Sequence, residues 1–245
     1  MELDAKYEYD GLTHIEYKFK GKKAITIFPP KEKMNGQTIL KTEYFSAFPE
    51  LQNEFVKRGY TLIYIENRNR WGTPCEVEDQ FEFVNYVAEE FGISNKVIAI
   101  GMSCGGMMAI LLAAKYPQCI KGLYLDAPVV NYLSCPGRMG VAYDVFDSMW
   151  QEFESAWGIT KSQLLTFREH PLDKLDKLVE NRVRVYMAYG DSDKTVPYEE
   201  NGIALERAYL NAGIVDLLKI DKKVGVDHHP HGPGCIDDVI EFFEK

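Results

Sequence analysis

The sequence predicts an α/β fold with a mostly parallel sheet, an N-terminal antiparallel hairpin and helices on both faces of the sheet. Three observations support this prediction. Short apolar runs alternate along the chain with segments whose apolar residues recur every three or four positions, as in an amphipathic helix. About 30 residues at the N-terminus instead alternate apolar and polar side chains, as strands do. Apolar residues make up 46% of the 245 residues, which is enough for a buried core.

The antiparallel hairpin is predicted close to the N-terminus. Residues 15–19 and 24–28 alternate apolar and polar side chains, and Gly21 lies in the turn between them. Pro29 and Pro30 end the second strand, because proline has no backbone N–H to donate to a sheet. We therefore expect two antiparallel strands before the chain enters the rest of the sheet.

The remainder of the chain alternates between strand and helix. Strands joined by helices form right-handed crossovers, which give a parallel sheet covered on both faces. The predicted strands are 37–42, 61–65, 96–102, 122–129, 183–189 and 216–220, and the predicted helices are 49–58, 76–91, 107–116, 198–211 and 236–243.

The chain is predicted to form a single domain, residues 1–245, with a cap insertion at 130–182. This stretch has no convincing strand and contains several large aromatic residues, among them Trp150 and Trp157. Long excursions between two strands are usually functional, so we expect a partly helical cap over the site. The alternative is an ordinary crossover helix with additional loops.

Charge and composition argue against several classes of partner and compartment. The formal net charge is −9, and an acidic surface repels phosphate backbones, so we expect no nucleic-acid partner. No apolar run approaches the ~20 residues of a membrane span, and no signal-peptide pattern is visible, so we expect no membrane association. The five cysteines form no C-x-x-C pair. This argues against a disulfide framework or a zinc site and favours a cytoplasmic location.

The sharpest local motif is the G-x-S-x-G pattern at residues 101–105, which read Gly-Met-Ser-Cys-Gly. A predicted buried strand precedes the motif and an apolar helix follows it, as a nucleophile elbow requires. In such a turn the hydroxyl of Ser103 stands clear of the sheet beside a helix N-terminus, which favours developing negative charge. The alternative is a glycine-rich turn with an incidental serine. We predict that Ser103 is a catalytic nucleophile.

Cys104 directly follows this serine and is a competing candidate as a thiol nucleophile. The central position of the motif belongs to Ser103, however. The residue after the nucleophile contributes its backbone N–H to the oxyanion hole. We therefore expect Cys104 to act through its amide, while its side chain packs.

A serine hydroxyl is a weak nucleophile and needs a general base that a carboxylate orients. Three of the five histidines lie within residues 227–231, Asp-His-His-Pro-His, after the last predicted strand. A histidine-rich tract can also bind a metal, but no carboxylates at ligand spacing accompany this one beyond Asp227. Residues 189–197 follow the preceding strand and offer Asp191 and Asp193 as the acid. One of the two should be solvated or cap the turn.

These segments together resemble the three signatures of α/β-hydrolases, and more narrowly those of prolyl oligopeptidase-like and carbohydrate-esterase-like bacterial serine hydrolases. The resemblance implies the α/β-hydrolase fold, Asp193 as the triad acid and His228 as the base, with His229 as the alternative base. The fold also places a second oxyanion donor in the loop after the third strand, where we select Thr42. The resemblance spans residues 37–245 and rests on residues 101–106, 126–129, 136–137, 190–197 and 228–232.

The predicted function is that of a serine carboxylic ester hydrolase that forms an acyl-enzyme and needs no metal or organic cofactor. The expected partners are small-molecule esters with short acyl or aryl groups, including acetyl or cinnamoyl esters of carbohydrates. Tyr132, Trp150 and Trp157 are predicted to line the substrate pocket, because aromatic side chains give a pocket large apolar area. Plain core packing is the alternative for them. The alternative functions are a peptidase that acts on short peptides and a non-catalytic binding protein of the same fold.

Overall fold

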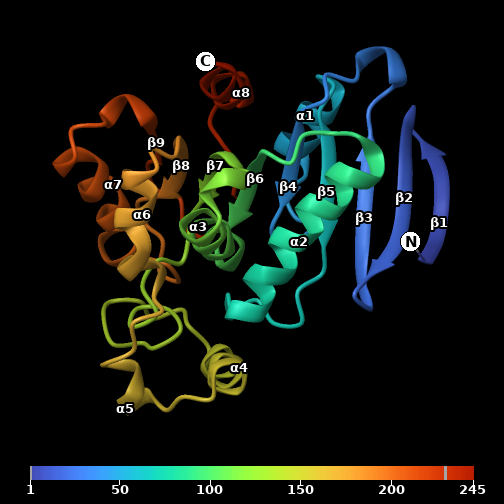
Figure 1. Cartoon of the computed structure of the whole chain (residues 1–245). Helices are drawn as coiled ribbons and strands as arrows, with labels where there is room; N and C mark the ends of the chain where they lie inside the picture. The colour runs from blue at the N-terminus through green and yellow to red at the C-terminus, as the bar shows by residue number, and fades with distance from the viewer. Residues whose placement is uncertain (1, 229–230) are drawn as a thin grey trace.

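One mixed sheet forms the centre of the molecule (Figure 1). The computed structural model describes residues 2–228 and 231–245. Within these residues the sheet has nine strands in the order β1-β2-β3-β5-β4-β6-β7-β8-β9. Neighbours from β1 to β5 along this order are antiparallel, and those from β5 to β9 are parallel. The strands are β1 (Glu2–Tyr9), β2 (Leu12–Phe19), β3 (Lys22–Phe28), β4 (Thr38–Lys41), β5 (Thr61–Ile65), β6 (Val97–Met102), β7 (Ile120–Asp126), β8 (Val185–Gly190) and β9 (Leu218–Lys223).

Helices cover both faces of this sheet, and each face has its own buried core. The α-helices are α1 (Glu50–Lys57), α2 (Pro74–Phe91), α3 (Cys104–Lys115), α4 (Asp147–Trp157), α5 (Lys161–Leu164), α6 (Leu175–Glu180), α7 (Gly202–Asn211) and α8 (Ile236–Glu244). The 3₁₀ helices are η1 (Lys31–Lys33), η2 (Pro117–Cys119), η3 (Pro171–Lys174), η4 (Tyr198–Glu200) and η5 (Val215–Leu217). The larger core joins the sheet to α2, α3, α6 and α7, and the smaller core joins the opposite face to α1 and α8. Successive strand residues point to opposite faces, so Ile39 lies in the smaller core and Leu40 in the larger.

The structure confirms the α/β fold, the parallel sheet and each of the predicted strands and helices, with shifts of a few residues at their ends. The N-terminal region differs, because it forms three antiparallel strands instead of a two-stranded hairpin. The additional strand is β1, at the edge of the sheet. Its larger apolar side chains, including Leu3 and Tyr9, are exposed, so it lacks the buried face that produces a period-two pattern.

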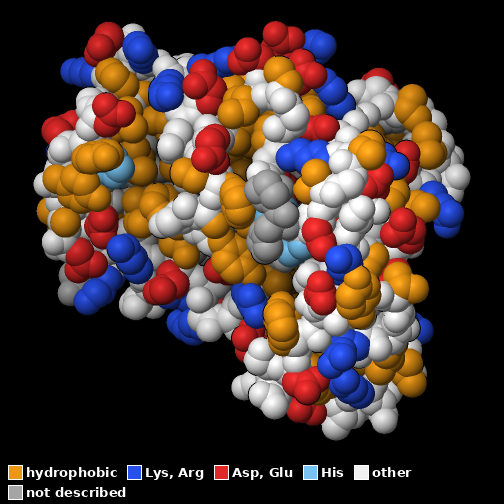
Figure 2. All heavy atoms as spheres, turned by 180° about the vertical axis from the view of Figure 1, so that it is seen from behind, with side chains coloured by type: hydrophobic (Ala, Val, Ile, Leu, Met, Phe, Trp, Pro, Cys, Tyr) orange, Lys and Arg blue, Asp and Glu red, His pale blue; other side chains and the backbone are white. Residues whose placement is uncertain are grey.

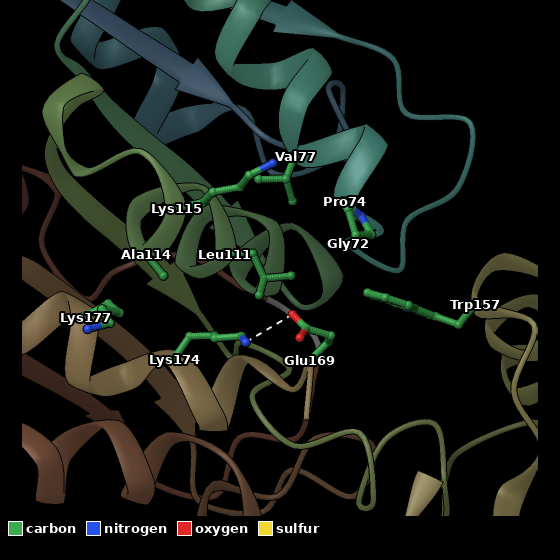
Figure 3. Close-up of a pocket in the computed structure, with 10 residues that line it drawn as sticks. All are labelled: Gly72, Pro74, Val77, Leu111, Ala114, Lys115, Trp157, Glu169, Lys174 and Lys177. Atoms are coloured by element: carbon green, nitrogen blue, oxygen red, sulfur yellow. Dashed lines mark ion pairs between the residues drawn. The ribbon is translucent and has the colours of Figure 1, made fainter. Parts of the chain in front are cut away.

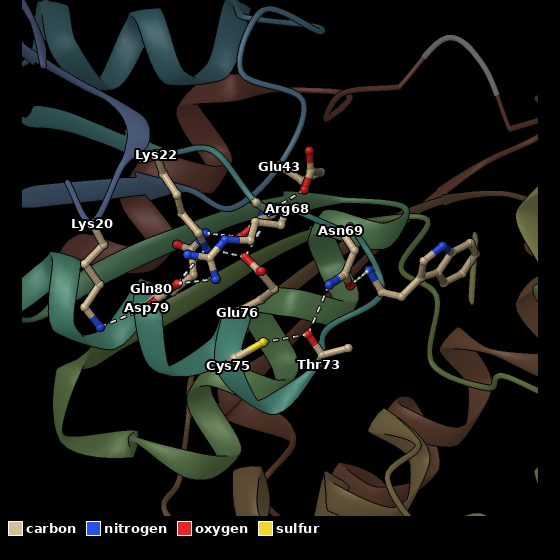
Figure 4. Close-up of polar contacts among 12 residues, drawn as sticks. Lys20, Lys22, Glu43, Arg68, Asn69, Thr73, Cys75, Glu76, Asp79 and Gln80 are labelled. Carbon is tan, nitrogen blue, oxygen red and sulfur yellow. Dashed lines mark hydrogen bonds and ion pairs between the residues drawn. The ribbon is translucent and has the colours of Figure 1, made fainter. Parts of the chain in front are cut away.

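Buried ion pairs join the antiparallel part of the sheet to α2 (Figure 4). Lys22 at the start of β3 is only 5% exposed, and its ammonium contacts the carboxylates of Glu76 and Asp79 on the first turns of α2. Taking charges out of water is costly unless the opposite charges stay together. These contacts therefore fix how α2 packs against β3, and with it the loop that follows β5.

The segment 130–182 contains α4, α5, η3 and α6 and no strand. In Figure 1, α4 and α5 project below the sheet, whereas α6 lies against the body of the molecule beside α3. The segment thus combines the two alternatives that the sequence left open. Its first part extends away from the sheet like a cap, and its last part is a crossover helix that leads into β8.

The surface carries charges of both signs. On the face shown in Figure 2, acidic and basic side chains are interspersed with apolar ones. No helix in the described part of the chain is long and apolar enough to span a membrane.

Candidate active site

Ser103 lies in the tight turn between β6 and α3. Its φ of 52° and ψ of −119° lie in a region that side-chain-bearing residues rarely adopt. Small neighbours make the turn possible, because a Cβ on Gly101 would lie 2.3 Å from the carbonyl oxygen of Gly105. A Cβ on Gly106 would lie 2.7 Å from the side chain of Pro128. The sequence therefore folds here into the elbow that the motif predicted, with a serine at its apex.

Three side chains that are far apart in the sequence form a hydrogen-bonded chain at this elbow. Nε2 of His228 lies 3.2 Å from Oγ of Ser103, and its Nδ1 lies 2.7 Å from Oδ2 of Asp193. An ionised carboxylate can only accept a hydrogen bond, so Nδ1 carries the proton and Nε2 is the acceptor for the serine hydroxyl. This arrangement allows the imidazole to take a proton from Ser103 while the carboxylate holds the ring in place.

The loop after β8 contains both candidate acids, and the structure separates them. The side chain of Asp193 is 1% exposed, and its Oδ1 accepts the backbone N–H groups of Thr195 and Val196 at 2.9 and 2.8 Å. Asp191 instead accepts the N–H of Gly225 at 2.7 Å and pairs with Lys222. The Gly225 hydrogen bond is the main reason why the pKa of Asp191 lies below its usual value. Of these two aspartates, Asp193 is the one that contacts the imidazole of His228.

The histidine loop follows β9 and is tied to the loop of Asp193. The carboxylate of Asp227 accepts the backbone N–H groups of His228 at 2.8 Å and of Lys194 at 3.0 Å. His231 points elsewhere, with Nδ1 2.6 Å from a carboxylate oxygen of Asp126. His229, the alternative base, lies outside the described residues.

The sequence model of the prolyl oligopeptidase family matches residues 58–225, which are more than half of the chain and include Ser103 and Asp193. The chain belongs to the prolyl oligopeptidase family. Its fold is that of the α/β-hydrolases. No curated protein sequence matches it.

Similar solved structures include both peptidases and an esterase. A candidate dipeptidyl aminopeptidase IV from Bacteroides ovatus is similar over 96% of this chain and 36% of its own, with a TM-score of 0.71 and 16% identity. Dipeptidyl peptidase 4 from Porphyromonas gingivalis is similar over 98% of this chain and 36% of its own, with a TM-score of 0.68 and 12% identity. A fungal esterase from Rhizomucor miehei is similar over 99% of this chain and 83% of its own, with a TM-score of 0.66 and 17% identity. These identities show the fold alone, and this chain spans about a third of each of the two peptidase chains.

In this family member, the two predicted oxyanion donors have different environments. Cys104 is the first residue of α3, where backbone N–H groups have no partner within the helix. Its side chain is buried, and burial raises the pKa of the thiol to about 11, so the thiol is not a reactive thiolate.

Thr42 is a wrong prediction for the second oxyanion donor. It is fully buried, and its N–H already donates to the carbonyl of Ile100 at 3.1 Å. Its hydroxyl bonds to the carbonyl of Gly105 at 2.7 Å, so Thr42 fastens β4 to the elbow instead.

Tyr44, two residues further along the same loop, is a residue that sequence reasoning missed. It lines the cavity at Ser103, and its hydroxyl accepts a hydrogen bond from Nη1 of Arg70 at 3.2 Å. Burial raises the pKa of Tyr44, so its hydroxyl keeps a proton to donate. Glu43 precedes Tyr44 in the sequence, and Figure 4 shows it beside the polar contacts of α2. The carboxylate of Glu43 accepts a hydrogen bond from the side-chain amide of Asn67 at 2.7 Å. No glycine pair marks this loop in the sequence, and only the packing reveals that Tyr44 lines the same cavity as the serine.

A cavity of about 590 Å³ opens at Ser103 and His228. The cap segment forms one wall of it, and the loops after β4 and β5 form another. Most of its side chains are apolar, with Arg70 and Asp144 as the charged exceptions. The residues that line it are Tyr44, Ala47, Phe48, Arg70, Met102, Ser103, Cys104, Cys135, Asp144, Phe146, Met149, Thr195 and His228.

Tyr132, Trp150 and Trp157, the predicted pocket residues, do not line this cavity. Tyr132 is fully buried, and Trp150 packs with it around Phe153 at ring distances of 4.8 and 5.5 Å. Trp157 lines a separate cavity of about 270 Å³ between α2, α3 and the cap (Figure 3). These aromatic residues form the core of the cap, which is the alternative that the sequence left open. Within the described residues, no cluster of three or more His, Cys, Asp or Glu side chains is placed to hold a metal.

Proposed function

We propose that this protein is a carboxylesterase that cleaves esters with short acyl or aryl groups through Ser103, His228 and Asp193. The hydrogen-bonded chain of these three side chains carries the proposal, and two of them, Ser103 and His228, line a cavity of about 590 Å³. Cavities of this size suit small ligands. The membership of the prolyl oligopeptidase family supports the serine chemistry, but it leaves the choice between ester and peptide bonds open.

The proposed mechanism has two halves. In the first, Oγ of Ser103 attacks the ester carbonyl while Nε2 of His228 accepts the hydroxyl proton, and His228 then protonates the departing alcohol. In the second, the same imidazole activates a water that hydrolyses the acyl-enzyme. Asp193 holds the ring and stabilises the imidazolium that forms in each half. No step requires a metal or an organic cofactor.

We propose that the oxyanion binds to the amide of Cys104 and to the hydroxyl of Tyr44. The amide begins a helix, whose N-terminus favours negative charge. The hydroxyl of Tyr44 lines the cavity and receives a hydrogen bond from Arg70, which strengthens it as a donor.

Tyr44→Phe is expected to lower kcat by about 10²-fold, because one oxyanion-hole donor typically contributes that much or more. Steady-state kinetics with p-nitrophenyl acetate would measure the effect. Tyr198→Phe is the matched control, since that hydroxyl lies outside the cavity and bonds to Glu206. A Tyr44→Phe enzyme with the kcat of the unaltered protein would remove Tyr44 from the mechanism.

The proposed preference for short chains rests on the wall that the cap contributes. Phe146 and Met149 of the cap line the cavity together with Tyr44 and Phe48 of the loop after β4, so apolar groups bound at Ser103 can contact both segments. This shape supports acetyl, butyryl or aryl esters, including acetyl or cinnamoyl esters of carbohydrates. A long alkyl chain would have to leave the cavity past the cap.

A series of p-nitrophenyl esters tests this preference. We expect kcat/KM to be at least about tenfold higher for acetate and butyrate than for laurate, since methylene-sized differences in an apolar pocket change kcat/KM by such factors. Phe146→Ala should narrow the difference, whereas Leu165→Ala should leave it unchanged. Both side chains are exposed residues of the cap segment, but only Phe146 lines the cavity. Laurate as the best substrate would contradict the proposal.

A peptidase is the second candidate, because the family whose sequence model matches is named for an oligopeptidase. A panel of short chromogenic peptides alongside the esters distinguishes the two. A higher kcat/KM on peptides than on every ester would replace the proposed function with this one. In either case we propose a small-molecule substrate, neither nucleic acid nor membrane as partner, and a cytoplasmic location. The net charge of −9 and the five free cysteines support these proposals.

A further inference from the structure

A second histidine–carboxylate pair lies beside the first. Asp126 is the last residue of β7, and its side chain is 6% exposed. Three donors converge on it. Nδ1 of His231 lies 2.6 Å from Oδ1, while Oδ2 accepts the hydroxyl of Tyr124 at 3.1 Å and the backbone N–H of Gly232. The carboxylate of Asp126 thus holds His231 and Gly232 at the end of a central strand.

The backbone of Asp126 contacts Ser103, the proposed nucleophile. Its carbonyl accepts the N–H of Ser103 at 2.8 Å, and β7 lies between β6, which leads into Ser103, and β8, which leads into Asp193. One residue therefore touches the serine elbow through its main chain and the histidine loop through its side chain.

The ring of His231, which Asp126 holds, packs directly against the ring of His228. The two imidazole rings pack edge to face, with centroids 4.6 Å apart and an angle of 88° between their planes. The ring of His231 also packs edge to face with Phe48, at 5.5 Å between centroids, and Phe48 lines the cavity at Ser103. Fixing His231 consequently limits how far the ring of His228 can move away from Ser103.

We propose that Asp126 and His231 are positioning residues, which hold the imidazole of His228 within hydrogen-bonding distance of Ser103. The inference rests on the proposed function, because it assumes that His228 is the base. A general base must lie about 2.6–3.2 Å from the atom whose proton it takes. Nε2 of His228 lies 3.2 Å from Oγ of Ser103, at the upper end of that range. A displacement of about 1 Å can lower a rate by about 10²-fold.

Asp126 also faces a buried cation, which matters for the choice of variants. Lys41 is 2% exposed, and its ammonium donates to the carbonyl of Ala47 at 3.1 Å. Burial lowers the pKa of Lys41 to about 8, and the negative charge of Asp126 acts in the opposite direction. Replacing Asp126 therefore removes a compensating charge as well as the contact to His231. Replacing His231 leaves the charge of Asp126 near Lys41 in place, so it isolates the positioning effect.

The test compares His231→Phe, His231→Gln and Asp126→Asn in the full chain. Phenylalanine keeps the ring but cannot donate to Asp126, whereas glutamine restores a donor. We expect His231→Phe to lower kcat on p-nitrophenyl acetate about 10- to 100-fold with little change in KM. The rate of covalent labelling by a fluorophosphonate should fall by a similar factor. His231→Gln should recover part of the loss, and Asp126→Asn should lose at least as much as His231→Phe.

Asp221→Asn is the matched control, because Asp221 accepts the N–H of Gly234 from the far end of the same loop at 2.6 Å. It should keep the kcat of the unaltered protein. Melting temperatures identify any variant that fails to fold. A folded His231→Phe with unchanged kcat and labelling rate, or with a change in KM alone, would overturn the proposal. If the unaltered protein is not labelled at Ser103, the proposed function itself fails, which is a different outcome from equal labelling of all variants.

Discussion

Replacing Ser103 by alanine is expected to abolish covalent labelling and to lower kcat on esters by at least about 10³-fold. No other group can take over the attack at this position. The thiol of Cys104 is buried and protonated at neutral pH, because burial raises its pKa to about 11. The residual rate should come only from the oxyanion donors and from binding. Labelling with a fluorophosphonate, followed by mass spectrometry of the peptide that contains residue 103, measures the first effect, and ester hydrolysis measures the second.

The control for this experiment is Ser192→Ala. Ser192 lies in the loop of Asp193, but its hydroxyl bonds to Asp191 and not to a histidine. It should be labelled and active like the unaltered protein. Alanine at 103 should leave the melting temperature nearly unchanged or raise it slightly, since the strained backbone of the elbow remains and only a hydroxyl is lost. Near-normal turnover by a folded Ser103→Ala variant would contradict both the site and the function.

The order of strands and helices could be predicted because most of them have one buried face or are buried throughout. β5 and β6 are buried along their entire lengths, and their apolar runs stand out in the sequence. β1 could not be recognised in this way. It lies at the open edge of the sheet with most of its side chains exposed. Its sequence therefore lacks the alternation of apolar and polar residues that identifies a strand with one buried face.

The elbow and the histidine loop were also readable from the sequence, because tight backbone geometry limits which residues fit. The structure leaves no room for a side chain at residues 101 and 106, so the glycines of the motif indicate the tight turn directly. The choice between Asp191 and Asp193 was not available from composition. It came from the resemblance to other hydrolases, and the structure gives its physical basis in the amides of Thr195 and Val196 that hold Asp193.

The parts of the site that the sequence did not yield depend on contacts between distant segments. Thr42 was selected as a donor from its place after a strand, but its amide belongs to the ladder with Ile100, 58 residues away. The sequence suggests a pocket role for the aromatic residues of the cap, but these residues pack on one another and form the apolar core of the cap. Asp126 and His231 are 105 residues apart, so no local pattern joins them.

The second large effect is expected at Asp193. Asparagine at this position should lower kcat by up to about 10⁴-fold while the protein stays folded, because an amide stabilises the wrong tautomer of the imidazole and does not stabilise the imidazolium. The loss should appear in kcat and not in KM, since Asp193 does not line the cavity. Steady-state kinetics on a short-chain ester measures both constants.

Asp191→Asn provides the matched comparison, two residues away in the same loop. Its carboxylate bonds to Gly225 and Lys222, so kcat should change by no more than a few fold. Its effect should be on stability. The pKa of Asp191 is lowered in the folded protein, so its contribution to stability is present above the unfolded value of about 3.9 and is lost as the pH falls below it. Asp191→Asn should therefore lower the melting temperature at pH 7 and approach the unaltered protein in acid. If Asp191→Asn abolished turnover while Asp193→Asn retained it, the assignment of the acid would have to be reversed.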